Sequence, residues 1–423
     1  MDAAVRAEGR ATSAPLALIA LGTAALGVAV YLGRGEAPVA VLLVLLALLA
    51  TGHRLLARWE VTIGILLVVI LFIPIKRYAF GAALPFDLEP YRIFVALAVL
   101  GWAVALLVDR RVALRGSDVD APLLFLGFVV IVSVALNADI ISGVGGDPPL
   151  ELSDNVAKEL LFLLSFFLVF YLLVSVLRSA ETIHAVLKTL VLGATIVAML
   201  AILERRTGYN AFNHLGFIPL LDFEGELGGS SVRRGGRLRV YGPAQHPIAL
   251  AAMLVMVVPV AVYFWHRTRR WLWLASAALL TLAALATVSR TAVVMLAAVV
   301  IVSALLRRAV VRPLLIAALP VAIAIHLVVP GAIGSLRGAF FPPEGLIQDQ
   351  TAFSGRASGE RLAPQFERIR ERPLFGQGYG TRVTRGLERN ARILDNQWLG
   401  TAVEIGLLGV AAWVWLFVRF LRR

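Results

Sequence analysis

The sequence predicts an all-α, polytopic membrane protein with about twelve transmembrane helices. Hydrophobic residues make up 59% of the 423 residues, above the roughly 45–50% of soluble domains. The mean hydropathy is +0.84. Apolar stretches that could cross about 30 Å of hydrocarbon recur along the chain, and a membrane-spanning helix satisfies its own backbone hydrogen bonds.

The apolar stretches define the expected helices in order. They lie at residues 15–33, 38–57, 60–75, 91–108, 121–136, 158–177, 183–203, 246–265, 271–288, 291–306, 313–330 and 397–418. The first follows a start without a small-residue cleavage pattern, so we expect a span and not a removed signal peptide. One helix over 271–306 would be about 54 Å long, too long for one crossing. We therefore expect a turn at Arg290.

Charge indicates the orientation. If the N-terminus is cytoplasmic and the spans alternate, the inner loops hold most arginines: Arg54, Arg58, Arg110, Arg111, Arg115, Arg178, Arg267, Arg269, Arg270, Arg307, Arg308, Arg312, Arg419, Arg422 and Arg423. The net charge of +13 is then an orientation signal with both termini inside. We expect membrane lipids, and no nucleic acid, as partners.

Two long polar connections fall on the outer face, at residues 204–245 and 331–396. Both exceed the length of about 12–15 residues beyond which a loop suggests function. We expect them to cap the active site of a single membrane domain over residues 1–423. The first should contain a short strand at "RLRVY" (237–241). The second should contain an amphipathic helix that Pro373 stops at Arg372.

Several cofactor sites are excluded. The chain has no cysteine, so disulfides and cysteine-ligated metal sites are absent. None of its lysines follows a glycine, which excludes a Gly-Lys-Ser/Thr phosphate loop. The histidines in or near inner loops and spans lack metal-ligand spacing, and we interpret them as structural: His53, His184, His266 and His326. We expect no cofactor and no metal.

Polar residues gather where "RLRVYGPAQHP" enters the eighth span. Pro247 suits the first turn of a helix, so Gln245 and His246 should lie at its outer mouth, just after Arg237 and Arg239. The alternative is that these arginines only reach towards lipid headgroups.

Two further positions carry charge near the outer face. Arg290 lies in an outer turn against the orientation signal, which indicates a functional or paired residue; the alternative is a structural salt bridge. Asp395 and Asn396 stand at the entrance of the last span, where Asp395 could simply cap the helix. Glu404, inside that span, should face the bundle interior and pair with a base or hydroxyl.

A glycine-rich stretch, "PLFGQGYGT", supplies Gly376, Gly378 and Gly380. The stretch is only a weak signal for dinucleotide binding, because no strand precedes it. We expect a tight loop whose backbone approaches a ligand or another helix.

Four segments together resemble the O-antigen ligase and polymerase family of bacterial membrane glycosyltransferases. They are "RLRVYGPAQHP", "TVSRTAVV", "SGRASGERLAPQFERIRERPLFGQGYGT" with Arg356 in its Ser-Gly-Arg motif, and "DNQWLGTAVEIGLLG". The resemblance implies glycan transfer at the outer leaflet of the cytoplasmic membrane, from an undecaprenyl-diphosphate carrier to an acceptor, without metal or nucleotide. The chain departs from the family where Asp395 stands at the position of a histidine. That leaves open a lipopolysaccharide ligase, a polysaccharide polymerase or a ligase for another surface polymer.

The chemistry assigns roles to these residues. A lipid diphosphate leaving group gains negative charge that guanidinium groups can hold, so we assign Arg239 and Arg290 to it, with Arg237 in support. Asp395 is the candidate base for the acceptor hydroxyl. The candidates for substrate binding are Arg237, Gln245, His246, Arg356, Gly376, Gly378 and Asn396. The alternatives are a transporter or flippase of a lipid-linked or anionic substrate, and a non-catalytic scaffold, which would leave Arg239, Arg290 and Asp395 far apart.

Overall fold

The computed structural model describes residues 58–80, 89–108, 112–142, 152–218, 221–225, 233–234, 237–306, 359–382 and 396–422. Within them, the helices long and apolar enough to cross a membrane are α5 (Pro90–Val108), α8 (Ser153–Val176), α9 (Ala180–Thr207), α10 (Pro247–Thr268) and α17 (Gln397–Leu421). Shorter apolar helices are α4 (Trp59–Phe72), α6 (Asp120–Leu136), α11 (Trp271–Ala286) and α12 (Arg290–Leu306). The mostly helical fold is thus confirmed. The spans expected at 15–33, 38–57 and 313–330 lie outside the described residues, so the count of about twelve stays a prediction.

The chain forms two compact units. The described parts of Met1–Gly101 and Leu177–Phe340 make unit 1, and those of Trp102–Val176 and Phe341–Arg423 make unit 2. The sequence predicted a single membrane domain over residues 1–423. The division into two compact units does not test this, so it stays a prediction.

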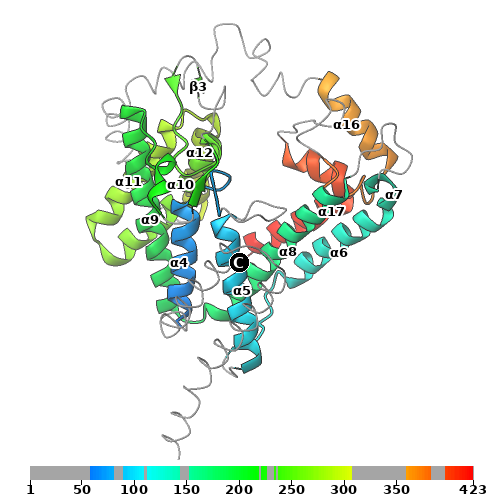
Figure 1. Cartoon of the computed structure of the whole chain (residues 1–423), viewed down its shortest axis with the longest axis horizontal. Coiled ribbons are helices and arrows are strands. Elements are labelled where there is room, and N and C mark those ends of the chain that lie inside the picture. Colours follow the sequence, from blue (N-terminus) through cyan, green and yellow to red (C-terminus); the bar gives the residue numbers. More distant parts are fainter. Residues whose placement is uncertain are drawn as a thin grey trace, which may run out of the picture. The chain divides into compact units, whose positions relative to one another are not determined.

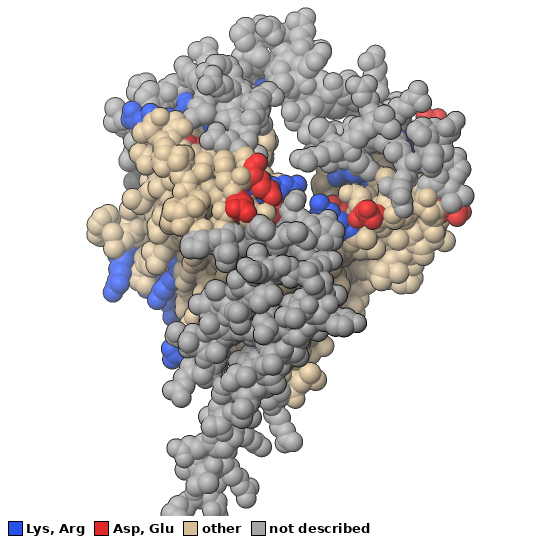
Figure 2. Space-filling model, viewed as in Figure 1, with Lys and Arg blue, Asp and Glu red and all other residues tan. Residues whose placement is uncertain are grey.

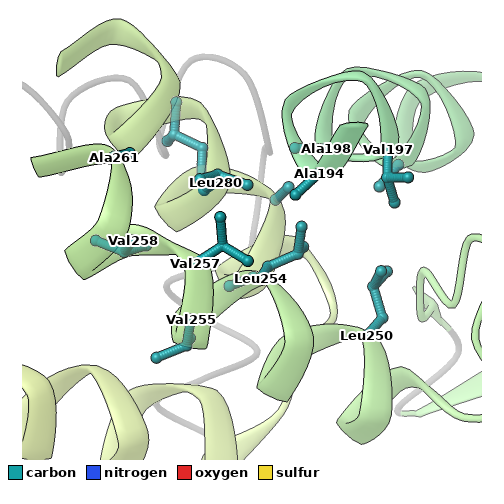
Figure 3. Packing of buried hydrophobic residues seen from close by; sticks show 14 of the residues in the cluster. Ala194, Val197, Ala198, Leu250, Leu254, Val255, Val257, Val258, Ala261 and Leu280 are labelled. Atoms are coloured by element: carbon teal, nitrogen blue, oxygen red, sulfur yellow. The ribbon is translucent and has the colours of Figure 1, made fainter. Parts of the chain in front are cut away.

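Unit 1 is built around α10, which packs against α9, α11 and α12, while α4 packs against α9 (Figure 1). Figure 3 shows the core between these helices, where Leu254 and Leu280 meet Ala194 and Ala198. Alanines on α9 and α11 are fully buried. Such small side chains let helix backbones approach closely, which favours helix packing in a bilayer.

Polar elements cover one end of unit 1. The three-residue strands β1 (Tyr78–Phe80) and β2 (Leu221–Phe223) pair antiparallel, with two 3₁₀ turns, η1 (Ala211–Asn213) and η2 (Leu215–Phe217), just before β2. The expected strand near residue 237 is confirmed as β4 (Arg237–Leu238), paired with β3 (Arg233–Arg234). Helix α9 continues to Thr207, a few residues past the apolar stretch expected at 183–203, and the outer connection at 204–245 stays a prediction.

Unit 2 contains α6, α7 (Ala138–Ile141), α8, α16 (Gly359–Glu371) and α17. Leu126, Val129 and Val130 of α6 pack against Ile405 and Ala412 of α17. The amphipathic helix predicted before Pro373 is confirmed as α16, which ends one residue earlier than expected.

The surface agrees with a membrane protein. Over unit 1, Figure 2 shows an uncharged belt with Lys and Arg side chains gathered towards its two ends. Large apolar side chains along the spans are exposed, as expected for helices that face lipid: among them Leu192, Ile196, Met199, Met256 and Val294. Together with the apolar helices, this supports an integral membrane protein.

Candidate functional site

Arg239 leaves β4 and turns into the interior of unit 1, where its side chain is only 7% exposed. Its Nε donates a hydrogen bond of 3.3 Å to the carbonyl oxygen of Thr287. Thr287 directly follows α11 and precedes Arg290, the first residue of α12, by three positions. The structure therefore brings Arg239 to the turn that carries Arg290, across about fifty residues of sequence.

The turn between α11 and α12 is where the length argument required one. Thr287, Val288 and Ser289 are buried, and the Thr287 hydroxyl donates to the carbonyl of Ala284 at 2.7 Å. Val288 has a φ of +50°, a conformation that is rare for a β-branched residue and costs on the order of 1–3 kcal/mol. Strain of this kind gathers at functional sites. Val288 therefore puts backbone strain two residues before Arg290.

His246 and Gln245 lie at the start of α10, as predicted. His246 is the N-cap residue, and its Nδ1 accepts a hydrogen bond of 3.1 Å from the amide of Ile248. Pro247 occupies the first turn. Since Nδ1 acts as an acceptor, the neutral ring carries its proton on Nε2. Gln245 is exposed. Arg237 contributes its backbone to β4.

Arg77 is a functional candidate that the sequence reasoning missed. It is 1% exposed and donates from Nη1 to Oδ1 of Asn213 at 2.6 Å and from Nη2 to the carbonyl of Gly242 at 2.5 Å. Gly242 lies in the turn between Arg239 and His246. Arg77 lies between the spans expected at 60–75 and 91–108, and the alternation of spans puts this connection on the outer face. A basic residue there runs against the positive-inside pattern, as Arg290 does, so the same signal could have found Arg77.

In unit 2 the glycine-rich loop packs against the last helix, α17. The sequence predicted that the backbone of this loop approaches either a ligand or another helix, and the structure shows the approach to a helix. The amides of Gln377 and Gly378 donate to the carbonyls of Val403 and Glu404 at 2.9 and 3.0 Å. A Cβ on Gly376 would lie 2.6 Å from the carbonyl oxygen of Val403. The glycines thus permit a close approach between two backbones. Substrate binding by Gly376 and Gly378 stays a prediction.

The last helix bends at the docking point. Gly406 has φ +70° and ψ −171°, which interrupts α17. The amides of Leu407 and Leu408 donate to the carbonyls of Pro373 and Leu374 at 2.8 and 3.3 Å. The loop therefore satisfies both the donors and the acceptors that the bend releases.

Glu404 pairs with a base, as predicted. Its Oε1 lies 3.7 Å from Nε of Arg382, and its side chain is mostly buried. Tyr379 lies nearby: burial, and then the charges of Glu159 and Glu404, raise the pKa of Tyr379 to about 12. This phenol is therefore a neutral hydrogen-bonding group at working pH.

At the start of α17, the N-cap is Asn396, whose Oδ1 accepts from the amides of Trp398 and Leu399 at 3.0 and 3.4 Å. The capping role considered for Asp395 is thus filled by its neighbour. Asp395 and Arg356 lie outside the described residues. Among the residues that the structure describes, no three His, Asp or Glu side chains are grouped to hold a metal ion.

The comparison with protein families agrees with the motifs. Residues 275–414 match the family described as O-antigen ligase. No curated protein and no solved structure matches the chain. The matched range runs from α11 into α17, so it includes Arg290, the glycine-rich loop and Asp395, whereas Arg77, Arg239 and His246 precede it.

The apolar helices support a polytopic integral membrane protein, and residues 275–414 of it are similar to O-antigen ligases. More closely, the match supports assigning the chain to the O-antigen ligase and polymerase family, and it confirms the resemblance drawn from the motifs. The family supports an enzyme of surface-polysaccharide biosynthesis that acts on lipid-linked glycans in the membrane.

Proposed function

We propose that this protein transfers a glycan from an undecaprenyl-diphosphate carrier to an acceptor hydroxyl at the outer face of the cytoplasmic membrane. Two findings support the proposal: the match to O-antigen ligases over residues 275–414, and the hydrogen bond from Arg239 to Thr287 at the turn that carries Arg290. The second carries the mechanism, because it gathers two arginines from distant segments in one unit.

The arginines act on the leaving group. When the bond between the anomeric carbon and the diphosphate oxygen breaks, the diphosphate gains negative charge. A guanidinium presents several N–H donors in a planar fork that suits phosphate oxygens, and it stays charged at every working pH. In a site that excludes water, such preorganised charge stabilises the transition state. Arg239 and Arg290 fill this role, with Arg237 in support, and the reaction needs no metal ion.

Asp395 acts on the acceptor. Its carboxylate takes the proton of the acceptor hydroxyl as the oxygen attacks the anomeric carbon, and undecaprenyl diphosphate leaves. Arginine neighbours would lower the pKa of such a base and desolvation would raise it. Gln245 and His246 then contact the donor glycan from the mouth of α10. Arg356, Gly376, Gly378 and Asn396 are the candidates for further substrate contacts.

A transferase is tested by what it releases. Purified full-length protein in lipid nanodiscs is incubated with a defined undecaprenyl-diphosphate glycan and candidate acceptors, and free undecaprenyl diphosphate is measured. We expect release only with a matching acceptor, together with the glycosylated product. Passage of the intact lipid-linked glycan across a vesicle membrane without release would contradict the proposal.

A transporter is the second candidate, and one observation favours it: α17 is broken at Gly406 beside the buried Glu404. Broken helices and buried charges near mid-membrane are typical of transporters. Here, however, the carbonyls of Val403 and Glu404 already accept from the glycine-rich loop. The break is thereby explained without a transported ion, which favours the transferase.

A further inference from the structure

The turn formed by Tyr241, Gly242, Pro243 and Ala244 connects Arg239 to His246 in unit 1. It is a short turn, in which the amide of Ala244 donates to the carbonyl of Tyr241 at 2.9 Å. Gly242 has a φ of +49°. Because only one residue separates Arg239 from this turn, and one separates the turn from His246, its conformation determines where both side chains lie.

Arg77 holds this turn from its carbonyl side. Nη2 donates to the carbonyls of Gly242 and Ala244, at 2.5 and 3.3 Å. The guanidinium carbon lies 5.1 Å from the centre of the Tyr241 ring, within the range of a cation–π contact. Asn213, which accepts from Nη1, also donates to the Tyr241 hydroxyl at 3.2 Å. One guanidinium thus contacts the turn at three of its four residues, Tyr241, Gly242 and Ala244.

Glu204 holds the same turn from its amide side. Its side chain is 2% exposed, and its carboxylate accepts from the amides of Tyr241 and Gly242 at 3.3 and 2.9 Å. Asn210 adds a hydrogen bond of 3.1 Å to the carbonyl of Gly242. A buried guanidinium and a buried carboxyl group both need hydrogen-bond partners, and the backbone of this turn supplies them. The two side chains together therefore hold the backbone of the turn in one conformation.

We propose that Arg77 is a positioning residue: through the Tyr241–Ala244 turn it fixes Arg239 for the lipid diphosphate and His246 for the donor glycan. The inference rests on the proposed function, in which Arg239 binds that diphosphate. Arg77 itself touches the turn and acts on the substrate only through it. Lysine at this position would supply the charge from a single nitrogen, and could not reach Asn213 and the two carbonyls together.

The test compares Arg77→Lys with Arg206→Lys in the full-length protein. Arg206 lies at the same end of α9 as Glu204 but is exposed, so Arg206→Lys is the control for the same substitution at an exposed position of unit 1. Hydrogen exchange is followed at residues 239–246, with residues 372–380 of unit 2 as the internal reference. Transfer kinetics with an undecaprenyl-diphosphate glycan give kcat and KM for the donor, also in the background of Arg239→Lys.

For Arg77→Lys we expect faster exchange at residues 239–246 and an unchanged reference. We also expect a fall in kcat/KM of about tenfold to a hundredfold, the size of effect that a misplaced catalytic group produces. The effects of Arg77→Lys and Arg239→Lys should be less than multiplicative, because both act on one group. Arg206→Lys should leave every readout within about twofold.

Two results would overturn the inference: exchange at residues 239–246 that stays as in the unchanged protein, or kinetic effects of Arg77→Lys and Arg239→Lys that multiply. If Arg77→Lys does not fold, Asn213→Ala replaces it, since it removes one partner of the guanidinium and keeps Arg77. If the unchanged protein releases no lipid diphosphate with any acceptor, the proposed function fails. The exchange measurement still decides whether Arg77 orders the turn.

Discussion

The bend of α17 at Gly406 depends on the absence of a side chain. A Cβ added there would overlap the carbonyl of Leu374 and lie 2.6 Å from the amide nitrogen of Phe375. Both are backbone groups of the docked loop, so neither can rotate away as a side chain would. Gly406→Ala should therefore push the glycine-rich loop off the last helix.

The cost has two parts. The φ of +70° with ψ of −171° lies in a region open almost only to glycine, and an alanine there costs on the order of 1–3 kcal/mol. Displacing the loop also breaks backbone hydrogen bonds worth about 0.5–1.5 kcal/mol each. They run from Gln377 to Val403, Gly378 to Glu404, Leu407 to Pro373 and Leu408 to Leu374. The loss is therefore at least about 3 kcal/mol, or roughly a hundredfold in local protection.

Hydrogen exchange at the amides of Gln377 and Gly378, with thermal unfolding of the purified protein, measures this loss. Gly208→Ala is the first control, because Gly208 has a φ of +76° with no atom near its added Cβ. It should cost only about 1 kcal/mol. Gly101→Ala, in α5 and also without neighbours, should be neutral or stabilise by up to about 1 kcal/mol. If Gly406→Ala loses no more than Gly208→Ala, the described docking is wrong.

Three further outcomes are expected. Asp395→Asn should lower the transfer rate by about 10²–10⁴-fold and leave the melting temperature unchanged, whereas Asn396→Ala should lower the stability by about 1 kcal/mol because it removes the N-cap of α17; equal transfer rates for Asp395→Asn and the unchanged protein would show that Asp395 is not the base. Arg382→Ala should destabilise unit 2 because it leaves the buried Glu404 without its ion pair, and adding Glu404→Gln should restore part of the melting temperature; no recovery in the double variant would show that the pair is not the cause. Treatment with EDTA should leave the rate of lipid diphosphate release unchanged, and a loss that Mg²⁺ restores would contradict a metal-free reaction.

Hydropathy predicted the described helices well, because the signal is local. The apolar run over 271–306 required a turn on length alone, and α11 ends at Ala286 while α12 begins at Arg290. The N-terminal signals of α10 were equally clear, since Pro247 follows a capping residue. In each case the residues that specify the feature lie within one or two turns of it.

The support for the candidate site could not be predicted in this way. Arg77 is 136 positions from Asn213 and 165 from Gly242, its hydrogen-bond partners, and a pattern along the chain does not record such contacts. The same holds for Gly406, which lies in a continuous apolar stretch and was expected inside an unbroken span. Its bend arises from the loop that begins at Pro373, about thirty residues earlier.

The central claim is that Arg239 and Arg290 act together on one lipid diphosphate. The most direct test is the rate of undecaprenyl diphosphate release by the unchanged protein, Arg239→Lys, Arg290→Lys and the double variant. Each single change should slow release by about tenfold to a hundredfold, as for the loss of a charge-assisted hydrogen bond, and the double variant should be faster than the product of the two effects predicts. Release at the unchanged rate by both single variants would contradict the account.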